Sequence, residues 1–148
     1  MPEQTLETLA RAGDQGPLGS HGLYLRGEAL RALGRHDEAL RWLDQAAQAA
    51  PGDVHVWLAM GWCHKRIGRL DLAIEDLQQA RAAEPSEPLI HYNLACYLSL
   101  AGDKHRAIAH LSEAISINPD FRALVEDERD FDPIRSDPEF RTLTAVSV

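Results

Sequence analysis

Histidine and cysteine side chains are the groups in this chain with the widest chemistry, because they ligate metals, transfer protons and act as nucleophiles. The sequence has seven histidines and two cysteines. His21 and His55 stand 34 residues apart and could face one another in a folded chain, with Cys96 on the same side. The spacings of a compact metal site, such as CxxC or two histidines one helical turn apart, do not occur. We therefore expect no metal and no cofactor.

Acidic side chains are the other candidates for chemistry. Five of them form one run: Glu126, Asp127, Glu128, Asp130 and Asp132. A run of this kind usually covers a solvated face, and the sequence has neither a glycine-rich phosphate loop nor a nucleophile elbow. The net charge of −8 argues against a phosphate-backbone partner. We expect neither catalysis nor nucleic-acid binding, although a role as the accessory subunit of an enzyme stays open.

A period of 34 residues organises the chain. Prolines mark it, and glycine, alanine and leucine keep the same register in columns: Pro17, Pro51, Pro85 and Pro119; Gly34, Gly68 and Gly102; Ala39, Ala73 and Ala107; Leu43, Leu77 and Leu111. A fixed period in this range is typical of stacked repeats, in which each unit buries its apolar face against its neighbours. Alanine and leucine supply most of the apolar residues, which favours helices over strands.

Each unit predicts two helices. In the second unit, apolar residues recur at helical spacing over residues 54–67 and again over 70–80. Gly68 lies between the two segments and provides a chain reversal, while Pro85 ends the second helix. The small residues Gly61 and Ala73 let the two antiparallel helices approach closely, whereas Trp57 fills the space beside them.

The pattern Trp57-x-x-Met60-Gly61-x-x-His64, followed by Gly68, Ala73, Leu77, Ala80 and Pro85, resembles the tetratricopeptide repeat. The resemblance covers three units, residues 20–53, 54–87 and 88–121. It implies an all-α fold, a right-handed α-solenoid of antiparallel helix pairs in a single domain. Because the family is a scaffold for unrelated partners, it also implies a protein-binding or peptide-binding module without naming the ligand.

Both ends depart from the period. Within residues 1–19 we expect a capping helix over residues 3–14, because Leu9 and Ala12 fall in repeat columns. Residues 122–148 are interpreted as an acidic cap. Asp132-Pro133 and Asp137-Pro138 each predict a helix start, with aspartate as N-cap and proline in the first turn. We expect the cap to bury these anchors: Phe121, Leu124, Phe131, Ile134, Phe140 and Leu143.

First helices line the concave side of the solenoid in this family. The resemblance therefore assigns a peptide-binding groove to these residues: Tyr24, Glu28, Arg31, His55, Leu58, Trp62, Lys65, Arg66, Leu89, Tyr92, Asn93 and Cys96. Exposed aromatic side chains beside basic ones favour a peptide with apolar anchors and some acidic character. Family members that clamp the acidic tails of heat-shock chaperones carry cations at positions where this chain has Tyr24, Leu89 and Asn93, and asparagine where it has Glu28 and Ala59. We therefore do not expect that ligand.

Single residues add detail to this groove. We expect Trp62 to be exposed in it, with packing against neighbouring helices as the alternative, and Trp57 to be core. Trp42 is expected on the second-helix side, exposed or half covered by the stem of Arg35 or Arg41. Asn93 hydrogen-bonds either a bound peptide or solvent. His64 and His91 fall in packing columns, which predicts partly buried, hydrogen-bonded side chains.

Two functions of different kinds stay open. The first is an adaptor or a chaperone-like module, such as the small three-repeat chaperones of secretion translocators. The second is a structural protein that self-assembles through Trp42 or the convex side, as a weak homo-oligomer. In a third hypothesis the acidic cap folds onto Lys65 and Arg66 and regulates the groove. Because the first ten residues lack the pattern of a secretory signal and no apolar run approaches membrane-spanning length, we expect a cytoplasmic protein without membrane insertion.

Overall fold

The computed structural model describes residues 19–145, so the capping helix predicted over residues 3–14 lies outside the described part of the chain. Between residues 19 and 145 the chain forms helices and no strands, which confirms the all-α prediction. The elements are α2 (Ser20–Ala32), α3 (His36–Ala49), α4 (Val54–Arg66), α5 (Leu70–Ala83), α6 (Pro88–Leu100), α7 (Lys104–Ile117), the 3₁₀ helices η1 (Pro119–Leu124) and η2 (Arg129–Ile134), and α8 (Pro138–Thr144).

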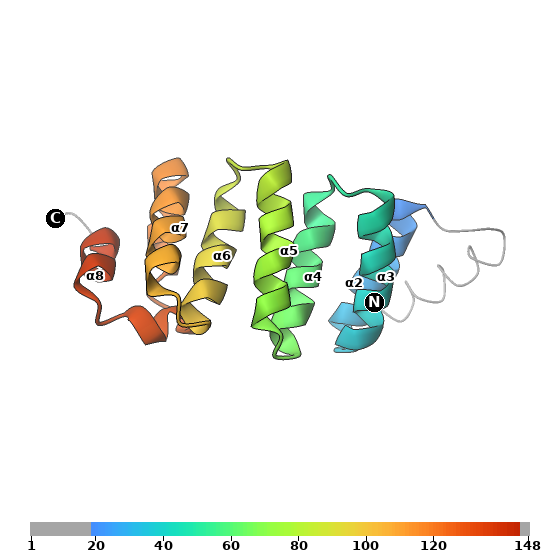
Figure 1. Cartoon of the computed structure of the whole chain (residues 1–148), viewed down its shortest axis with the longest axis horizontal. Coiled ribbons are helices and arrows are strands. Elements are labelled where there is room, and N and C mark those ends of the chain that lie inside the picture. The colour runs from blue at the N-terminus through green and yellow to red at the C-terminus, as the bar shows by residue number, and fades with distance from the viewer. Residues whose placement is uncertain (1–18, 146–148) are drawn as a thin grey trace. The chain divides into compact units, whose positions relative to one another are not determined.

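Two compact units divide the chain, Met1–Ala83 and Glu84–Val148. In the first unit α2 pairs with α3 and α4 pairs with α5, and α3 also packs on α4 (Figure 1). In the second unit α6 pairs with α7. No helix of residues 19–145 is both long enough and apolar enough to cross a bilayer.

Glycine makes the same turn in each helix pair. Gly34, Gly68 and Gly102 have φ values of 78°, 83° and 86°, a region that a side chain with a Cβ rarely adopts. The next residue closes each turn by a hydrogen bond to a carbonyl five positions back, as Arg69 N does to His64 O at 2.8 Å. This is the Schellman geometry of helix C-termini. The predicted reversal at the glycine column is confirmed.

Small residues bring the paired helices together. A Cβ added to Gly27 of α2 would lie 2.6 Å from Leu43 Cγ and 3.3 Å from the Ala39 carbonyl oxygen of α3. Ala39 and Leu43 are fully buried, as are their column equivalents in the next two pairs. The conserved spacing of small and large residues within this one sequence is therefore a packing requirement of the helix pair.

The C-terminal segment forms a cap in which some predicted details are wrong. Asp137 does cap α8, accepting hydrogen bonds from the backbone nitrogens of Glu139 and Phe140. Asp132-Pro133, however, starts no helix, because Pro133 lies inside η2 and Glu128 is the N-cap. The predicted anchor Leu124 is 52% exposed, and the adjacent Val125 is buried instead. A 3₁₀ helix has three residues per turn, so its inward residues do not follow the α-helical spacing that we assumed.

Three anchors of the cap are placed as predicted. Phe131, Ile134 and Phe140 are buried, and the ring centroids of Phe131 and Phe140 lie 5.7 Å apart. η2 packs on α6, and η1 packs on α7. Arg135 holds the connection between the two 3₁₀ helices, because its Nη2 donates to the carbonyl oxygens of Val125 at 2.9 Å and Glu128 at 2.5 Å.

Candidate functional site

A hollow of ≈ 220 Å³ opens between the first helices of repeats 1 and 2. It is lined by Tyr24, Glu28 and Arg31 from α2 and by His55, Leu58, Ala59 and Trp62 from α4. We call it the α2–α4 hollow. Six of these seven residues belong to the predicted binding groove, and Ala59 lies on the same first-helix face. The residues recur at three- and four-residue steps, so each helix presents one face to the hollow.

Trp62 is the largest side chain in the α2–α4 hollow, and it is half-buried. The guanidinium carbons of Arg31 and Arg66 each lie 4.8 Å from its ring centroid. His36, the first residue of α3, meets the indole edge-on, with ring centroids 5.3 Å apart. Each cation–π contact at such a site contributes about 0.5–1 kcal/mol. Trp62 is therefore held in one orientation before any ligand arrives, and the two expectations for it, groove exposure and packing, both apply in part.

Arg31 and Glu28 form a fixed ion pair at the wall of the hollow. Arg31 Nε and Nη2 donate to the two carboxylate oxygens of Glu28, each at 2.9 Å. Burial raises the pKa of the neighbouring Tyr24 hydroxyl, and the Glu28 charge adds to that rise, so Tyr24 stays neutral. The wall therefore offers a neutral hydroxyl and a guanidinium whose charge is balanced. His55, which lines the hollow, and Arg66, which lies over the indole, are both exposed.

The third repeat does not extend this surface as the sequence predicted. Leu89 is exposed and Asn93 is half-buried, but Tyr92 and Cys96 are buried at 7% and 3% exposure. The cap covers them, because the Tyr92 ring lies 5.4 Å from that of Phe121 and 5.6 Å from that of Phe131. The Tyr92 hydroxyl also donates to the Leu124 carbonyl oxygen at 3.4 Å. The assignment of Tyr92 and Cys96 to an open groove is therefore wrong.

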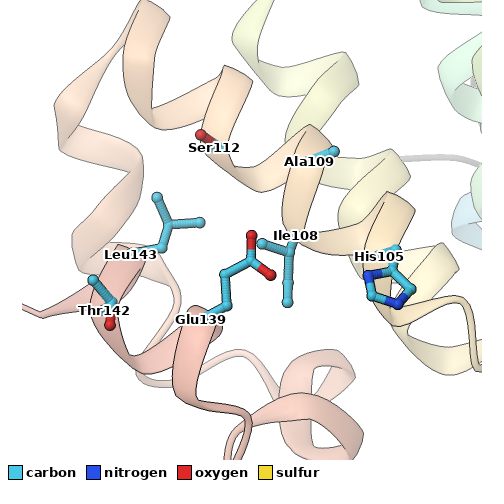
Figure 2. Close-up of a pocket in the computed structure, with 7 residues that line it drawn as sticks. All are labelled: His105, Ile108, Ala109, Ser112, Glu139, Thr142 and Leu143. Atoms are coloured by element: carbon cyan, nitrogen blue, oxygen red, sulfur yellow. The ribbon is translucent and has the colours of Figure 1, made fainter.

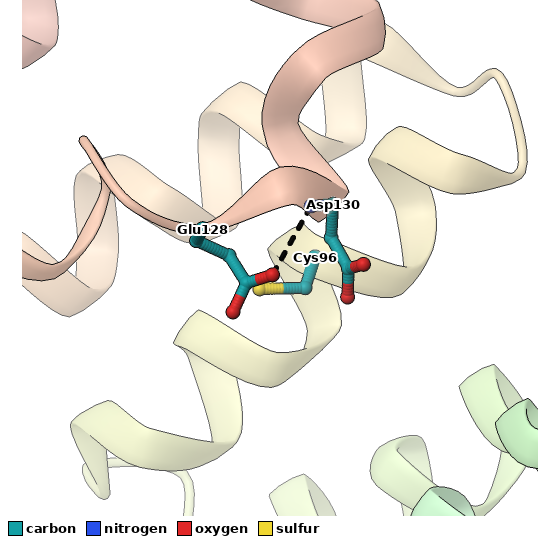
Figure 3. A group of neighbouring side chains, drawn as sticks. All are labelled: Cys96, Glu128 and Asp130. Carbon is teal, nitrogen blue, oxygen red and sulfur yellow. Dashed lines mark hydrogen bonds between the residues drawn. The ribbon is translucent and has the colours of Figure 1, made fainter.

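Cys96 of α6 and two cap residues, Glu128 and Asp130, form a cluster (Figure 3). Their sulfur and carboxylate oxygens all lie within 4.8 Å of one another, and among residues 19–145 they are the one group of three or more histidine, cysteine or acidic side chains so close together. Glu128 has a structural role here, because its Oε1 accepts the Asp130 backbone N–H at the start of η2. His21 and His55, considered above as metal ligands, are not part of this group, and the His21 ring lies 6.4 Å from that of Tyr24.

The packing histidines are hydrogen-bonded as predicted. His91 Nε2 lies 2.6 Å from the Pro85 carbonyl oxygen, the same bond that Trp57 Nε1 makes to Pro51 at 2.8 Å in the preceding repeat. A carbonyl oxygen only accepts, so His91 Nε2 carries the hydrogen. In the second repeat His64 Nδ1 lies 2.5 Å from Asp76 Oδ2. Burial raises the pKa of Asp76, and the His64 contact opposes that rise.

Two larger hollows lie outside the predicted groove. One, of ≈ 470 Å³, lies over α3, α4 and α5 in the first unit, and Trp57, Met60 and Asp76 are among the residues that line it. The other, of ≈ 610 Å³, separates α7 from α8 in the second unit (Figure 2). Ile108 and Leu143 form its apolar part, and Glu139 points into it (Figure 2). Neither hollow includes a residue of the predicted groove.

Trp42 and Trp57 are each partly exposed. An arginine covers Trp42, but it is neither Arg35 nor Arg41 as predicted: the guanidinium carbon of Arg26 in α2 lies 4.3 Å from the ring centroid. Trp57 packs against the core of the first unit, but it is only half-buried, so the prediction of a core residue is confirmed in part.

Three family models match the chain, and each is described as Tetratricopeptide repeat. They match residues 30–95, 3–54 and 89–121. The first of them begins at the end of α2 and spans α3, α4 and α5. A comparison with curated protein sequences finds no significant match.

Solved structures share the fold. YrrB, described as a TPR protein with an unusual peptide-binding site, is 22% identical with a TM-score of 0.77, covering 85% of this chain and 65% of that one. MamA is 18% identical with a TM-score of 0.80, covering 94% and 80%. SycD, a type III secretion translocator chaperone of Yersinia enterocolitica, is 21% identical with a TM-score of 0.63, covering 84% and 81%. This chain spans just under two thirds of YrrB, and at these identities the likeness concerns the fold alone.

Proposed function

The chain belongs to the tetratricopeptide repeat family, and on that premise we propose that it captures a peptide segment of a partner protein in the α2–α4 hollow. Its fold is that of a protein-interaction module, and such modules typically carry no catalytic activity of their own. The partner is a protein or peptide. An adaptor and a chaperone-like role both fit this activity, because each needs a groove that holds an extended segment.

The arrangement around Trp62 is the observation that supports the proposal. The indole, the Arg31 guanidinium, the Tyr24 hydroxyl and the apolar Leu58 side chain line one hollow on the first helices, and Arg66 lies over the indole. Tryptophan, tyrosine and arginine are the residues most enriched at the energetic centres of protein interfaces. Because Arg31 and Arg66 fix the indole in advance, a ligand loses less free energy in ordering it.

The relatives add support of a general kind. YrrB is described by its peptide-binding site and SycD as a translocator chaperone, so both roles occur on this fold.

We propose the cytoplasm as the compartment, since Cys63 and Cys96 are buried free thiols. Regulation of the hollow by the acidic residues 122–148 stays a prediction.

Site-specific photo-crosslinking tests the proposal. A benzophenone amino acid at His55, exposed at the rim of the α2–α4 hollow, is compared with one at Gln45, exposed on the second helix of repeat 1. In lysate of the native host, we expect His55 to crosslink to peptides of a partner protein and Gln45 not to. Equal crosslinking at both positions, or crosslinks only between copies of this chain, would contradict capture in the hollow.

Self-assembly through the second-helix side remains the alternative. This alternative needs Trp42 to make an apolar contact with a second copy of the chain. Arg26 lies over the Trp42 ring, which leaves less of its apolar surface open for such a contact. Crosslinks between copies at Gln45 would favour it.

A further inference from the structure

Two equivalent positions of the repeat are open in the second repeat and covered in the third. Leu58 and Trp62 of the second repeat line the open α2–α4 hollow. Their equivalents 34 residues later, Tyr92 and Cys96, are buried. In the third repeat, therefore, this helix face is already occupied, and its occupant is the C-terminal segment of the same chain, since η2 packs on α6. That segment is a bound example of what the face accepts.

The occupant combines an aromatic anchor with carboxylates. Phe131 is fully buried and meets the Tyr92 ring edge-on at 5.6 Å between centroids. Glu128 and Asp130 place their carboxylates beside Cys96, which shares its column with Trp62 (Figure 3). Asp132 follows directly after the anchor. The segment that fills the third repeat is thus a phenylalanine with acidic residues on both sides.

The second repeat has the better electrostatic complement to such a segment. Three and four residues after Cys96 the third repeat has Ser99 and Leu100. At the equivalent positions after Trp62 the second repeat has Lys65 and Arg66. Arg66 is exposed and its guanidinium lies 4.8 Å from the Trp62 ring centroid. Positive charge at this rim contrasts with the chain's net charge of −8, so a carboxylate is attracted to this part of the surface in particular.

We infer that the α2–α4 hollow selects partner segments in which an aromatic side chain is flanked by acidic residues, the chemistry that residues 128–132 present to the third repeat. This rests on the proposed function, because it specifies the ligand of the same hollow. The aromatic ring packs on Leu58 and Trp62, and a flanking carboxylate pairs with Arg66. An apolar segment without acids leaves Arg66 without a carboxylate partner, while an acidic segment without an aromatic makes no packing contact with Leu58 and Trp62.

Titration calorimetry with the full chain tests this selectivity. The probe is a synthetic peptide of residues 126–134, Glu-Asp-Glu-Arg-Asp-Phe-Asp-Pro-Ile, with blocked ends. One control peptide has alanine in place of phenylalanine, and the other has the acids replaced by their amides. We expect each control to bind about tenfold more weakly than the probe, because each loses one buried or charge-assisted contact.

Two protein variants locate the binding. Arg66→Gln should weaken the probe about tenfold and leave the amide peptide unaffected, whereas Arg41→Gln, the same charge change at an exposed residue of α3, should leave both unaffected. The inference is overturned if the probe does not bind, if the amide peptide binds as tightly, or if the two variants act alike. Crosslinking from His55 to a partner of other chemistry would then leave the proposed function standing, whereas failure of that crosslinking would remove both.

Discussion

Replacing Phe131 by alanine should open the cap and uncover the third repeat. Phe131 is fully buried, and its ring centroid lies 5.6 Å from that of Tyr92 and 5.7 Å from that of Phe140. Truncating a buried phenylalanine costs about 3–5 kcal/mol. The six residues of η2 have few other anchors, Ile134 being the next, so this loss is comparable with the whole local stability of the cap.

Cys96 reports the opening, because its thiol lies beneath the cap at 3% exposure. We would measure its labelling by an aromatic disulfide reagent at pH 8, in a Cys63→Ala background that leaves one thiol. When opening and closing are fast, the labelling rate follows the opening equilibrium. A loss of about 4 kcal/mol then predicts labelling about a thousandfold faster in Phe131→Ala.

Leu124→Ala is the matched control, since it removes an apolar side chain of the same cap that is 52% exposed. We expect it to change the free energy of opening by less than about 0.5 kcal/mol. If both variants label Cys96 equally fast, the cap is not what covers this thiol. Loss of most of the helical circular dichroism in Phe131→Ala would also refute local opening, because it would show that α6 and α7 cannot stay folded without the cap.

Three further predictions concern the first unit. Gly27→Ala should lower the free energy of unfolding in urea by about 1 kcal/mol, because overpacking against Leu43 at 2.6 Å outweighs the gain in helix propensity; an unchanged value would contradict the packing argument. Burial raises the pKa of the Cys63 thiol from 9.0 to about 11, so the unfolded chain ionises first and stability falls as the pH rises from 9 towards 11. Cys63→Ala should remove this part of the decline, and an identical pH profile in both proteins would count against it. Trp42→Ala should leave the sedimentation coefficient independent of concentration and equal to that of the wild type, whereas a change in oligomeric state between the two would favour self-assembly.

The helix pairs could be predicted from the sequence because every pair is specified locally. Gly68 sets the turn through a positive φ, and Gly27 and Leu43 set the distance between paired helices. These are contacts between neighbouring elements, and they recur at each period, so one repeat supports the interpretation of the next. The cap has no second copy in the sequence. Its 3₁₀ helices break the α-helical spacing on which the predicted anchor Leu124 depended, and Val125 took the buried position.

The candidate site could be predicted only where nothing outside the repeat covers it. Column position correctly brings Tyr24, Leu58 and Trp62 into one hollow, because α2 and α4 present the same face. It also placed Arg31 and Arg66 at the flank of this surface. It could not give their contacts over the Trp62 ring, since arginine side chains have many rotamers and their position depends on local contacts. Nor could it show that Tyr92 is covered, because the covering residues lie beyond the last repeat.

The covering of Tyr92 also limits where this chain can bind a partner. A repeat array offers one equivalent face for each repeat, and equivalence in the columns alone would make all three available. Phe131 packs on the Tyr92 ring and so occupies the face of the third repeat. A free peptide that bound there would first have to displace Phe131, at a cost of several kcal/mol. Binding by displacement is therefore weaker than binding to the open α2–α4 hollow by the same amount. If the proposed function holds, the non-repeating end of the chain directs ligands to the first two repeats, and Trp62 and Arg66, which differ from their column equivalents, are the residues we expect to give specificity.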